Sequence, residues 1–228
     1  MKRNITPHAP GAAKRSPSST TTAIATAAAR LIAEGAEDWG QACHRAARDL
    51  GAPDRTPMPD AALLHESVRT HLALFCPQQC AELAALRALA LHWMQRLAAF
   101  CPHITGAVWN GLATRHSAVC LHLFCDDAKA LDIALINAGV RYDVRRAPDA
   151  AGMRHEWLVF GSACPALGRA VDVRLRVRSA GELRGALRRL GADGRSALGG
   201  AAQLRARIAA EDKAPPGGWG TFPSFPSL

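Results

Sequence analysis

Residues 106–127 read GAVWNGLATRHSAVCLHLFCDD, and this stretch decides which fold the chain can adopt. An apolar run ends at a glycine turn at Gly111, a short polar loop follows, and a second apolar run leads into Asp126 and Asp127. Apolar runs bounded by turn residues are typical of buried strands, and aspartates after such a run are typical of the first turn of a helix. The stretch therefore predicts a strand over 104–109, a glycine loop and a second strand over 119–125.

The hydrophobic pattern extends this arrangement to both sides. Upstream, apolar residues recur at helical spacing, with stops at Gly35 and Gly51 and a cap at Asp60. Downstream, short runs rich in β-branched residues alternate with helical segments. The pattern predicts helices over 23–35, 37–50, 60–74, 77–100, 126–138, 180–190 and 201–211, and further strands over 140–144, 157–160 and 171–177.

Composition separates the two chain ends from this region. The first residues are basic and rich in Pro, Ser and Thr, and the last are rich in Pro, Gly and Ser. We expect a disordered basic tail over 1–22, a helical region over 23–100, an α/β domain over 101–212 and a second tail over 213–228. Trp219, Phe222 and Phe225 of the second tail are candidates for docking on a partner, although an unstructured end is the simpler expectation.

The charge of the chain is uneven along its length. The net charge is +9, and arginines outnumber lysines 24 to 4. Residues 35–139 carry eight basic and ten acidic side chains, whereas residues 140–213 carry fifteen and eight. A basic C-terminal half favours a phosphate-bearing ligand, RNA or an acidic protein as partner, and a solvated arginine-rich surface is the alternative.

Cysteine usage and hydropathy bear on the compartment. The seven cysteines are odd in number and form no paired framework, which is typical of reduced thiols inside a cell. The basic N-terminus has the composition of either a mitochondrial transit peptide or a bacterial tail. No apolar run approaches the ~18 residues that a membrane-spanning helix needs, so we expect a cytoplasmic protein that does not use a membrane.

The central stretch resembles the signature of the nucleotidyltransferase superfamily, in which a glycine turn precedes a strand that carries Asp-x-Asp. Gly111-Leu112-Ala113 stands at the glycine turn, and residues 117–121, SAVCL, stand where Ser-Asp-x-Asp-Leu is expected. The chain is more closely similar to a group of uncharacterised proteobacterial proteins described as nucleotidyltransferase-like, through AARLIAEG (28–35), HRAARDLG (44–51) and GLATRHSAVCLHLF (111–124).

Some members of that group carry the name UDP-N-acetylmuramate–alanine ligase. This chain has no G-x-x-x-x-G-K-[ST] loop to hold ATP phosphates, and 228 residues are too few for a three-domain ligase. The resemblance instead implies an α/β fold with the helical region packed on a small mixed sheet of nucleotidyltransferase type.

The same resemblance implies a site from which the metal ligands have been lost. Ala118 and Cys120 replace the two carboxylates that would hold Mg²⁺, and Asp172 is the possible remnant of a third. We therefore expect no Mg²⁺ cofactor and no metal site, and a catalytically degenerate protein that binds a nucleotide or phosphate or regulates another process. The expected ligand-binding residues are Gly111, Ser117, Arg174 and Arg176.

Residues 171–178, VDVRLRVR, alternate strictly between apolar and charged side chains. This period of two places Asp172, Arg174, Arg176 and Arg178 on one face of a strand. An anion site and an ordinary solvated face, with Asp172 paired to an arginine, both produce this pattern.

Other chemistries remain open at the level of sequence. An active transferase would need unusual ligands, such as Asp172 with Asp126 or Asp127. An RNA-associated protein would use the strand face that carries Arg174, Arg176 and Arg178. His116, Cys120 and His122, with Cys101 or His103, could supply nitrogen and sulfur ligands for zinc, although their spacing matches no standard pattern. Cys120 with His116 or His122 could form a nucleophile and base. Helix capping is the better explanation of Asp126 and Asp127.

Overall fold

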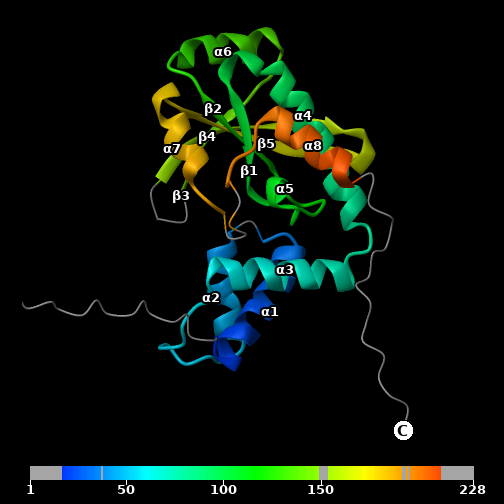
Figure 1. The fold of residues 1–228 in the computed structure, drawn as a ribbon, viewed down its shortest axis with the longest axis vertical. Helices are drawn as coiled ribbons and strands as arrows, with labels where there is room; N and C mark the ends of the chain where they lie inside the picture. Colours follow the sequence, from blue (N-terminus) through cyan, green and yellow to red (C-terminus); the bar gives the residue numbers. More distant parts are fainter. Residues whose placement is uncertain (1–16, 37, 149–153, 192–193, 195, 212–228) are drawn as a thin grey trace, which may run out of the picture.

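The computed structural model describes residues 17–36, 38–148, 154–191, 194 and 196–211. Within these residues the chain is α/β, with a group of three helices below a five-stranded mixed sheet and further helices around the sheet (Figure 1). The predictions for residues 1–16 and for the tail over 213–228 lie outside the described residues.

The N-terminal group consists of α1 (Ser19–Ala33), α2 (Trp39–Asp49) and α3 (Ala61–Phe75). Each helix begins at a capping side chain, from Ser18, Asp38 and Asp60, that accepts a backbone N–H of the first turn. Their apolar faces form one core with Ile24, Ala28, Ala46, Val68 and Leu72 at its centre.

The predicted tail over 1–22 is wrong at its C-terminal end, because α1 already includes residues 19–22. The Ser18 hydroxyl accepts the Thr21 N–H, and the Thr22 hydroxyl donates to the Ser18 carbonyl. Thr21 is also buried and donates to the carbonyl of Pro57, so tertiary contacts extend the helix beyond the part that the apolar pattern reveals.

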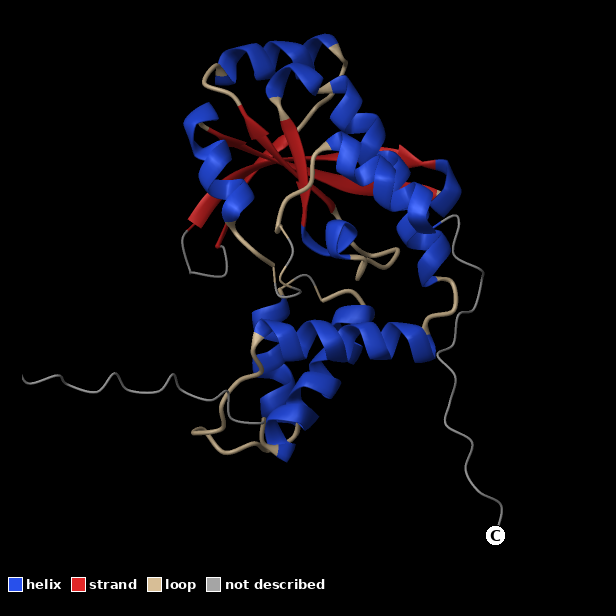
Figure 2. Ribbon diagram, viewed as in Figure 1, coloured by secondary structure: helices blue, strands red, loops and turns tan. Residues whose placement is uncertain are grey.

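The sheet, whose strands are red in Figure 2, has the strand order β1-β2-β5-β4-β3. β2 (Val119–Phe124) pairs parallel with β5 (Arg169–Arg178) and antiparallel with β1 (Pro102–Thr105). β4 (Arg154–Cys164) pairs antiparallel with both β5 and β3 (Asp143–Pro148). The mixed character of the sheet is therefore as expected from the sequence.

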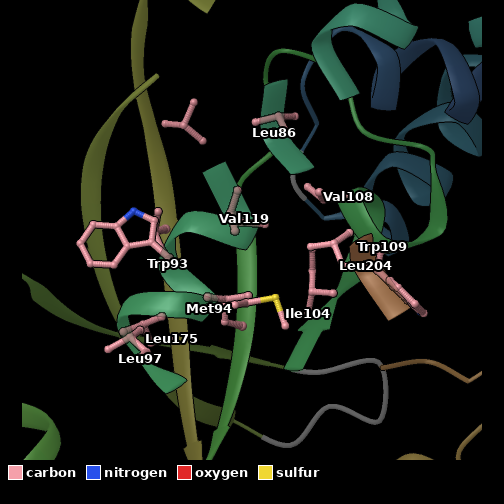
Figure 3. Close-up of a cluster of buried hydrophobic side chains, with 14 of the residues drawn as sticks. Leu86, Trp93, Met94, Leu97, Ile104, Val108, Trp109, Val119, Leu175 and Leu204 are labelled. Atoms are coloured by element: carbon pink, nitrogen blue, oxygen red, sulfur yellow. The ribbon is translucent and has the colours of Figure 1, made fainter. Parts of the chain in front are cut away.

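One face of the sheet carries the main core. The side chains of α4 (Gln79–Arg96) pack on it, as do Leu131 and Leu135 of α6 (Ala128–Asn137) and Leu204 of α8 (Ala201–Glu211). Figure 3 shows Leu86, Trp93, Met94 and Leu97 beside Val119, Ile104 and Leu175, with Leu204 nearby. The fourth helix of the predicted helical region thus belongs to the sheet's core, whereas α1–α3 form their own.

The opposite face of the sheet carries a smaller cluster of buried residues. Phe124, at the end of β2, packs with Leu198 and with Ala186 of α7 (Leu183–Arg188), which follows a 3-10 turn over Ala180–Glu182. α1–α3 lie toward the other end.

Two further 3-10 turns occupy Ala98–Phe100 and Pro165–Leu167. None of the helices that the structure describes is long and apolar enough to cross a membrane.

The strand predicted over 104–109 is wrong in its second half. β1 ends at Thr105, and Gly106, at φ 73°, turns the chain into the short helix α5 (Gly106–Asn110), which ends at Gly111 with φ 79°. Glycine adopts this left-handed backbone without steric cost. Val108 and Trp109 are apolar because they pack in the core from a helix. A short apolar run of this kind looks the same in the sequence as a buried strand.

Arg87, on α4, is buried and holds three elements together. Its Nε donates to the Val108 carbonyl over 3.1 Å, and Nη1 pairs with the Glu211 carboxylate at the end of α8. Arg207, also on α8, donates to the Trp109 carbonyl over 2.6 Å and lies 3.5 Å from the centre of the Trp109 ring. Buried guanidinium groups are tolerated only when their donors are satisfied, so α5 and α8 are fixed relative to α4.

We expect Arg87→Met to lower the free energy of unfolding by about 2–4 kcal/mol, because buried carbonyls on α5 lose a donor and α8 loses its ion pair. Urea unfolding at neutral pH measures this loss. Arg205→Met is the matched control, since Arg205 is exposed on α8 and its replacement should change stability by less than about 0.5 kcal/mol. Equal losses in the two variants would contradict the role of Arg87.

Candidate functional site

A cavity of about 270 Å³ lies between the N-terminal helices and one end of the sheet. One wall comes from α1–α3 and the turn between α1 and α2, and contains Ile32, Gly35, Ala36, Trp39 and His65. The other wall comes from α5, the loop over 111–118, β2 and β5, and contains Gly106, Ala107, Asn110, Leu112, Thr114, His116, Ser117, Ala118, Cys120 and Arg174. Other cavities exist, but this one gathers the positions that the sequence singles out.

The loop over 111–118 is held in place by hydrogen bonds from α4 and within itself. The Gln79 side chain donates to the carbonyls of Gly111 and Ala113 over 3.2 and 2.9 Å. The Glu82 carboxylate accepts the Arg115 N–H over 2.9 Å, and the Ser117 hydroxyl accepts the Thr114 N–H over 3.1 Å. The wall carrying Ser117 and Ala118 is therefore preorganised rather than a free loop.

The strand that carries Asp172 lies directly beside the strand that carries Cys120. In the parallel pairing of β2 with β5, Cys120 is the partner of Arg174. Continuing this register by one residue sets Ala118 beside Asp172. The apolar residues of the two strands, Val119, Leu121, Val173 and Leu175, are fully buried on one face of the sheet. The residues between them, including Cys120 and Arg174, therefore lie on the other face, where the cavity is.

Of the four expected ligand-binding residues, two line the cavity. Ser117 and Arg174 do so, together with the degenerate positions Ala118 and Cys120. Arg176 lies one pleat further along β5 and contacts the His155 ring nitrogen Nδ1 over 2.8 Å. Gly111 is not among the described lining residues: it ends α5 with a left-handed backbone, and a side chain added there would meet Arg87 and Leu83 of α4.

Asp172 does not belong to the set of described residues that line the cavity. Its carboxylate lies 3.7 Å from Arg174 Nη2, and its side chain is 47% exposed, against 24% for Arg174. The pairing of Asp172 with an arginine on the same strand, which the alternation allowed, is therefore present. The arginine of this pair, rather than the carboxylate, faces the cavity.

Asp126 and Asp127 lie at the far end of β2 from Ala118. The Asp127 carboxylate caps α6 by accepting the Ala130 N–H, and Asp126 accepts the Ala180 N–H over 3.0 Å. Since a strand rises ~3.3 Å per residue, the two aspartates are more than 20 Å along the chain from position 118. The idea that they join Asp172 in a metal site is wrong, and helix capping explains Asp127.

The described lining residues carry positive or neutral side chains only. They include one guanidinium, from Arg174, and two imidazoles, from His65 and His116, and no carboxylate. The ring of Trp39 lies 5.1 Å from that of His65 in an edge-to-face arrangement, which gives the helical wall an aromatic surface. This combination suits an anionic ligand with an unsaturated ring better than a metal cation.

Sequence reasoning missed Trp39, His65, Gly106 and Asn110. Trp39 and His65 sit on helices whose apolar and polar pattern is that of ordinary amphipathic helices, so nothing local marks them. Gly106 carried a signal, because a glycine between an apolar strand and a helix is where a sharp turn is needed, but the apolar residues after it suggested a longer strand.

The zinc hypothesis gains no support from the geometry of the described residues, in which no three His, Cys, Asp or Glu side chains are grouped so as to hold a metal ion. Of the residues proposed as a nucleophile and base, Cys120 and His116 both line the cavity. Cys120 and His122 share a strand face as expected. Cys120 lines the cavity, whereas His122 lies outside it, packed 5.7 Å from the Trp157 ring.

His122 is the residue with the most perturbed acid–base chemistry near the site. Burial, followed by the positive charges of Arg176 and Arg178 and then by His103 and His155, lowers the pKa of His122 from 6.5 to about 3. The neutral imidazole is therefore the native form at neutral pH. Unfolding exposes the ring, which then takes up a proton at any pH below about 6.5.

This shift predicts that acid destabilises the protein through His122. Because the unfolded chain binds one more proton than the native protein between pH 6.5 and about 3, stability is fully present above pH 6.5 and falls as the pH is lowered through this window. Between pH 7 and pH 5 we expect His122 to contribute a loss of up to about 2 kcal/mol.

Urea unfolding of the wild type and of His122→Phe at both pH values measures the contribution. The variant should lose less stability than the wild type on acidification, whatever its absolute stability. A pH dependence that is identical in the two proteins would contradict the prediction.

Comparison with models of known protein families, with curated proteins and with solved structures finds no match to this chain.

Proposed function

We propose that the chain is a nucleotidyltransferase-like protein that has lost its metal site and that binds a nucleotide or another phosphate-bearing ligand in the cavity. The observation that carries the proposal is the pairing of Cys120 with Arg174 at the cavity wall. A position at which the resemblance expects a metal-binding carboxylate thus holds a thiol, and a guanidinium lies beside it.

The arrangement of the cavity wall supports the resemblance. The strand β1, the short helix α5, the glycine turn at Gly111, a short loop and the strand β2 follow one another, and β5, the strand with the candidate third carboxylate, pairs with β2. The resemblance requires this neighbourhood, although other α/β folds can also place two strands in this way.

Electrostatics favour an anion over a divalent cation. At an effective dielectric of ~20, two unit charges ~4 Å apart interact by about 4 kcal/mol, so Arg174 opposes Mg²⁺ while Ala118 and Cys120 offer it no hard oxygen ligand. The nearest carboxylate on β5, Asp172, is already paired with Arg174. The same guanidinium can donate two parallel hydrogen bonds to a phosphate.

The size and walls of the cavity support a small ligand. Ligand cavities commonly span about 300–1,000 Å³, so a volume of about 270 Å³ suits a mononucleotide or a smaller phosphate ester rather than a polymer. Trp39 and His65 would meet the base, and Arg174 with Ser117 would meet the phosphate. In this role the protein would sense or hold its ligand rather than transform it.

Cys120 makes ligand binding measurable within the native chain. We expect AMP or UMP at saturating concentration to slow alkylation of Cys120 by N-ethylmaleimide, because Cys120 lines the cavity. Exposed Cys80, on α4 and outside the cavity lining, should be alkylated at the same rate with and without nucleotide and serves as the internal control. Peptide mass spectrometry follows both thiols, with EDTA present throughout.

Arg174→Gln tests the phosphate contact in the same assay. Loss of a charge-assisted hydrogen bond should raise the nucleotide concentration needed for protection by about tenfold or more. Arg45→Gln, which removes an exposed positive charge on α2, is the matched control and should leave protection unchanged. Protection that survives Arg174→Gln, or that is absent in the wild type, would count against the proposal.

The loss of catalysis predicts that the wild type transfers no nucleotide. Purified protein is incubated with radiolabelled nucleoside triphosphates, Mg²⁺ or Mn²⁺ and a mixed acceptor pool, beside the double variant Ala118→Asp with Cys120→Asp. We expect no incorporation by the wild type, and metal binding only in the double variant, because two oxygen ligands are restored there. Incorporation by the wild type that disappears in Asp172→Asn would show a working transferase and overturn this interpretation.

A further inference from the structure

The half of the sheet formed by β3, β4 and β5 is much more basic than the rest of the described chain. Between residues 141 and 178 the described residues include eight arginines and three carboxylates, an excess of five positive charges. The described residues of α1–α3 and their connections, between 19 and 75, hold five arginines and six carboxylates. This half of the sheet is therefore much more basic than the N-terminal helices, and five further described arginines lie between residues 184 and 207.

Strand register places several of these groups on the sheet face away from α4. His122 pairs with Arg176, and Arg145 pairs with Trp157. Continuing the pairing of Leu158 with Leu175 by one residue brings Trp157 beside Arg176, so these four residues form one row across four strands. Arg174 and Arg178 lie one pleat to either side on β5.

We call the surface made by Arg145, His155, Trp157, Arg174, Arg176 and Arg178 the arginine face. Along β5 its guanidinium groups repeat every second residue, or ~6.6 Å, which is close to the spacing of phosphates in an extended single strand. Arg145 is exposed, Trp157 is half-buried, and Arg174 and Arg178 are partly covered by their pairing with Asp172 and Glu182. The accessible part of the arginine face lies over β4 and β3.

We propose that the arginine face binds single-stranded nucleic acid. The excess of positive charge calls for a polyanion, and repeated arginines follow a phosphate backbone. Trp157 and His155 add flat rings between the arginines, on which unpaired bases can stack, whereas a duplex keeps its bases stacked inside and an acidic peptide makes no use of such rings. The site is separate from the mononucleotide cavity, since only Arg174 belongs to both.

The test measures fluorescence anisotropy of labelled oligo(U) and oligo(dT) of about twelve nucleotides, within the usual site size of ~4–16, and of a duplex of equal length. With the whole chain we expect both single strands to bind more tightly than the duplex, and binding to weaken steeply between about 50 and 200 mM salt.

Two variants and one control identify the surface. Arg145→Gln with Arg176→Gln should weaken single-strand binding at least about tenfold and reduce the slope of log K against log salt by about 1–2. Trp157→Leu should weaken binding by about fivefold or more without changing that slope. Arg45→Gln with Arg69→Gln removes the same charge from exposed positions on α2 and α3 and should change neither quantity.

Several results would overturn the proposal. They are equal weakening by the control pair, a duplex bound as tightly as the single strands, Trp157→Leu without effect, or no binding at about 50 mM salt. Arg145→Gln alone keeps the test valid if the double variant fails to fold, because Arg145 is exposed on the edge strand β3; it should still weaken binding by about threefold or more. Thermal unfolding of each variant confirms the fold.

Discussion

The buried guanidinium of Arg87 is the interaction on which the architecture of the site depends. A five-residue helix such as α5 cannot be stable alone, because forming the first turn costs more than its hydrogen bonds return. Arg87 supplies a donor to the Val108 carbonyl from α4 and meets Glu211 of α8. Trp109 is further held between Arg207 and Gly199, where even a methyl group would collide with the indole ring. The end of α5 that carries Asn110 to the cavity is thus set by groups on α4 and α8, far from it in the sequence.

Most strands could be predicted because each carries its own local signal, whereas the hydrophobic pattern alone does not show which strands are neighbours in the sheet. The alternation in β5 and the apolar run of β2 are local, and both elements formed within a few residues of the predicted limits. The prediction of a strand over 104–109 is wrong in its second half, because Val108 and Trp109 are apolar residues of a helix that packs in the core. Trp39 and His65 could not be predicted as site residues. The sequence of an amphipathic helix does not show which neighbouring element each of its side chains will contact. The resemblance placed Asp172 beside Ala118, but only the structure shows that Arg174 points into the cavity.

The character of the cavity follows from Cys120 on β2, Arg174 on β5 and Ala118 just before β2, while the other face of these two strands is fixed by packing. Val119, Leu121, Val173 and Leu175 are fully buried, so substitutions among them cost stability. Ala118, Cys120 and Arg174 lie on the opposite face, where a change of charge costs the fold little. In the proposed function, the change from a site that attracts Mg²⁺ to one that attracts a phosphate would therefore need only a few substitutions on this face of the sheet.

The arginines of β5 connect the two proposed binding sites and also limit how they can act together. Arg174 is paired with Asp172 and Arg178 with Glu182, so an incoming phosphate must compete with carboxylates for these guanidinium groups. Such competition weakens binding and makes it sensitive to salt, since each arginine exchanges one anion for another. A ligand in the cavity that takes Arg174 from Asp172 would leave that carboxylate uncompensated at the end of the arginine face and would repel a nucleic-acid phosphate there. The two sites should therefore oppose each other through Asp172, and the opposition should disappear when this residue is neutralised, because the carboxylate that pairs with Arg174 has then lost its charge.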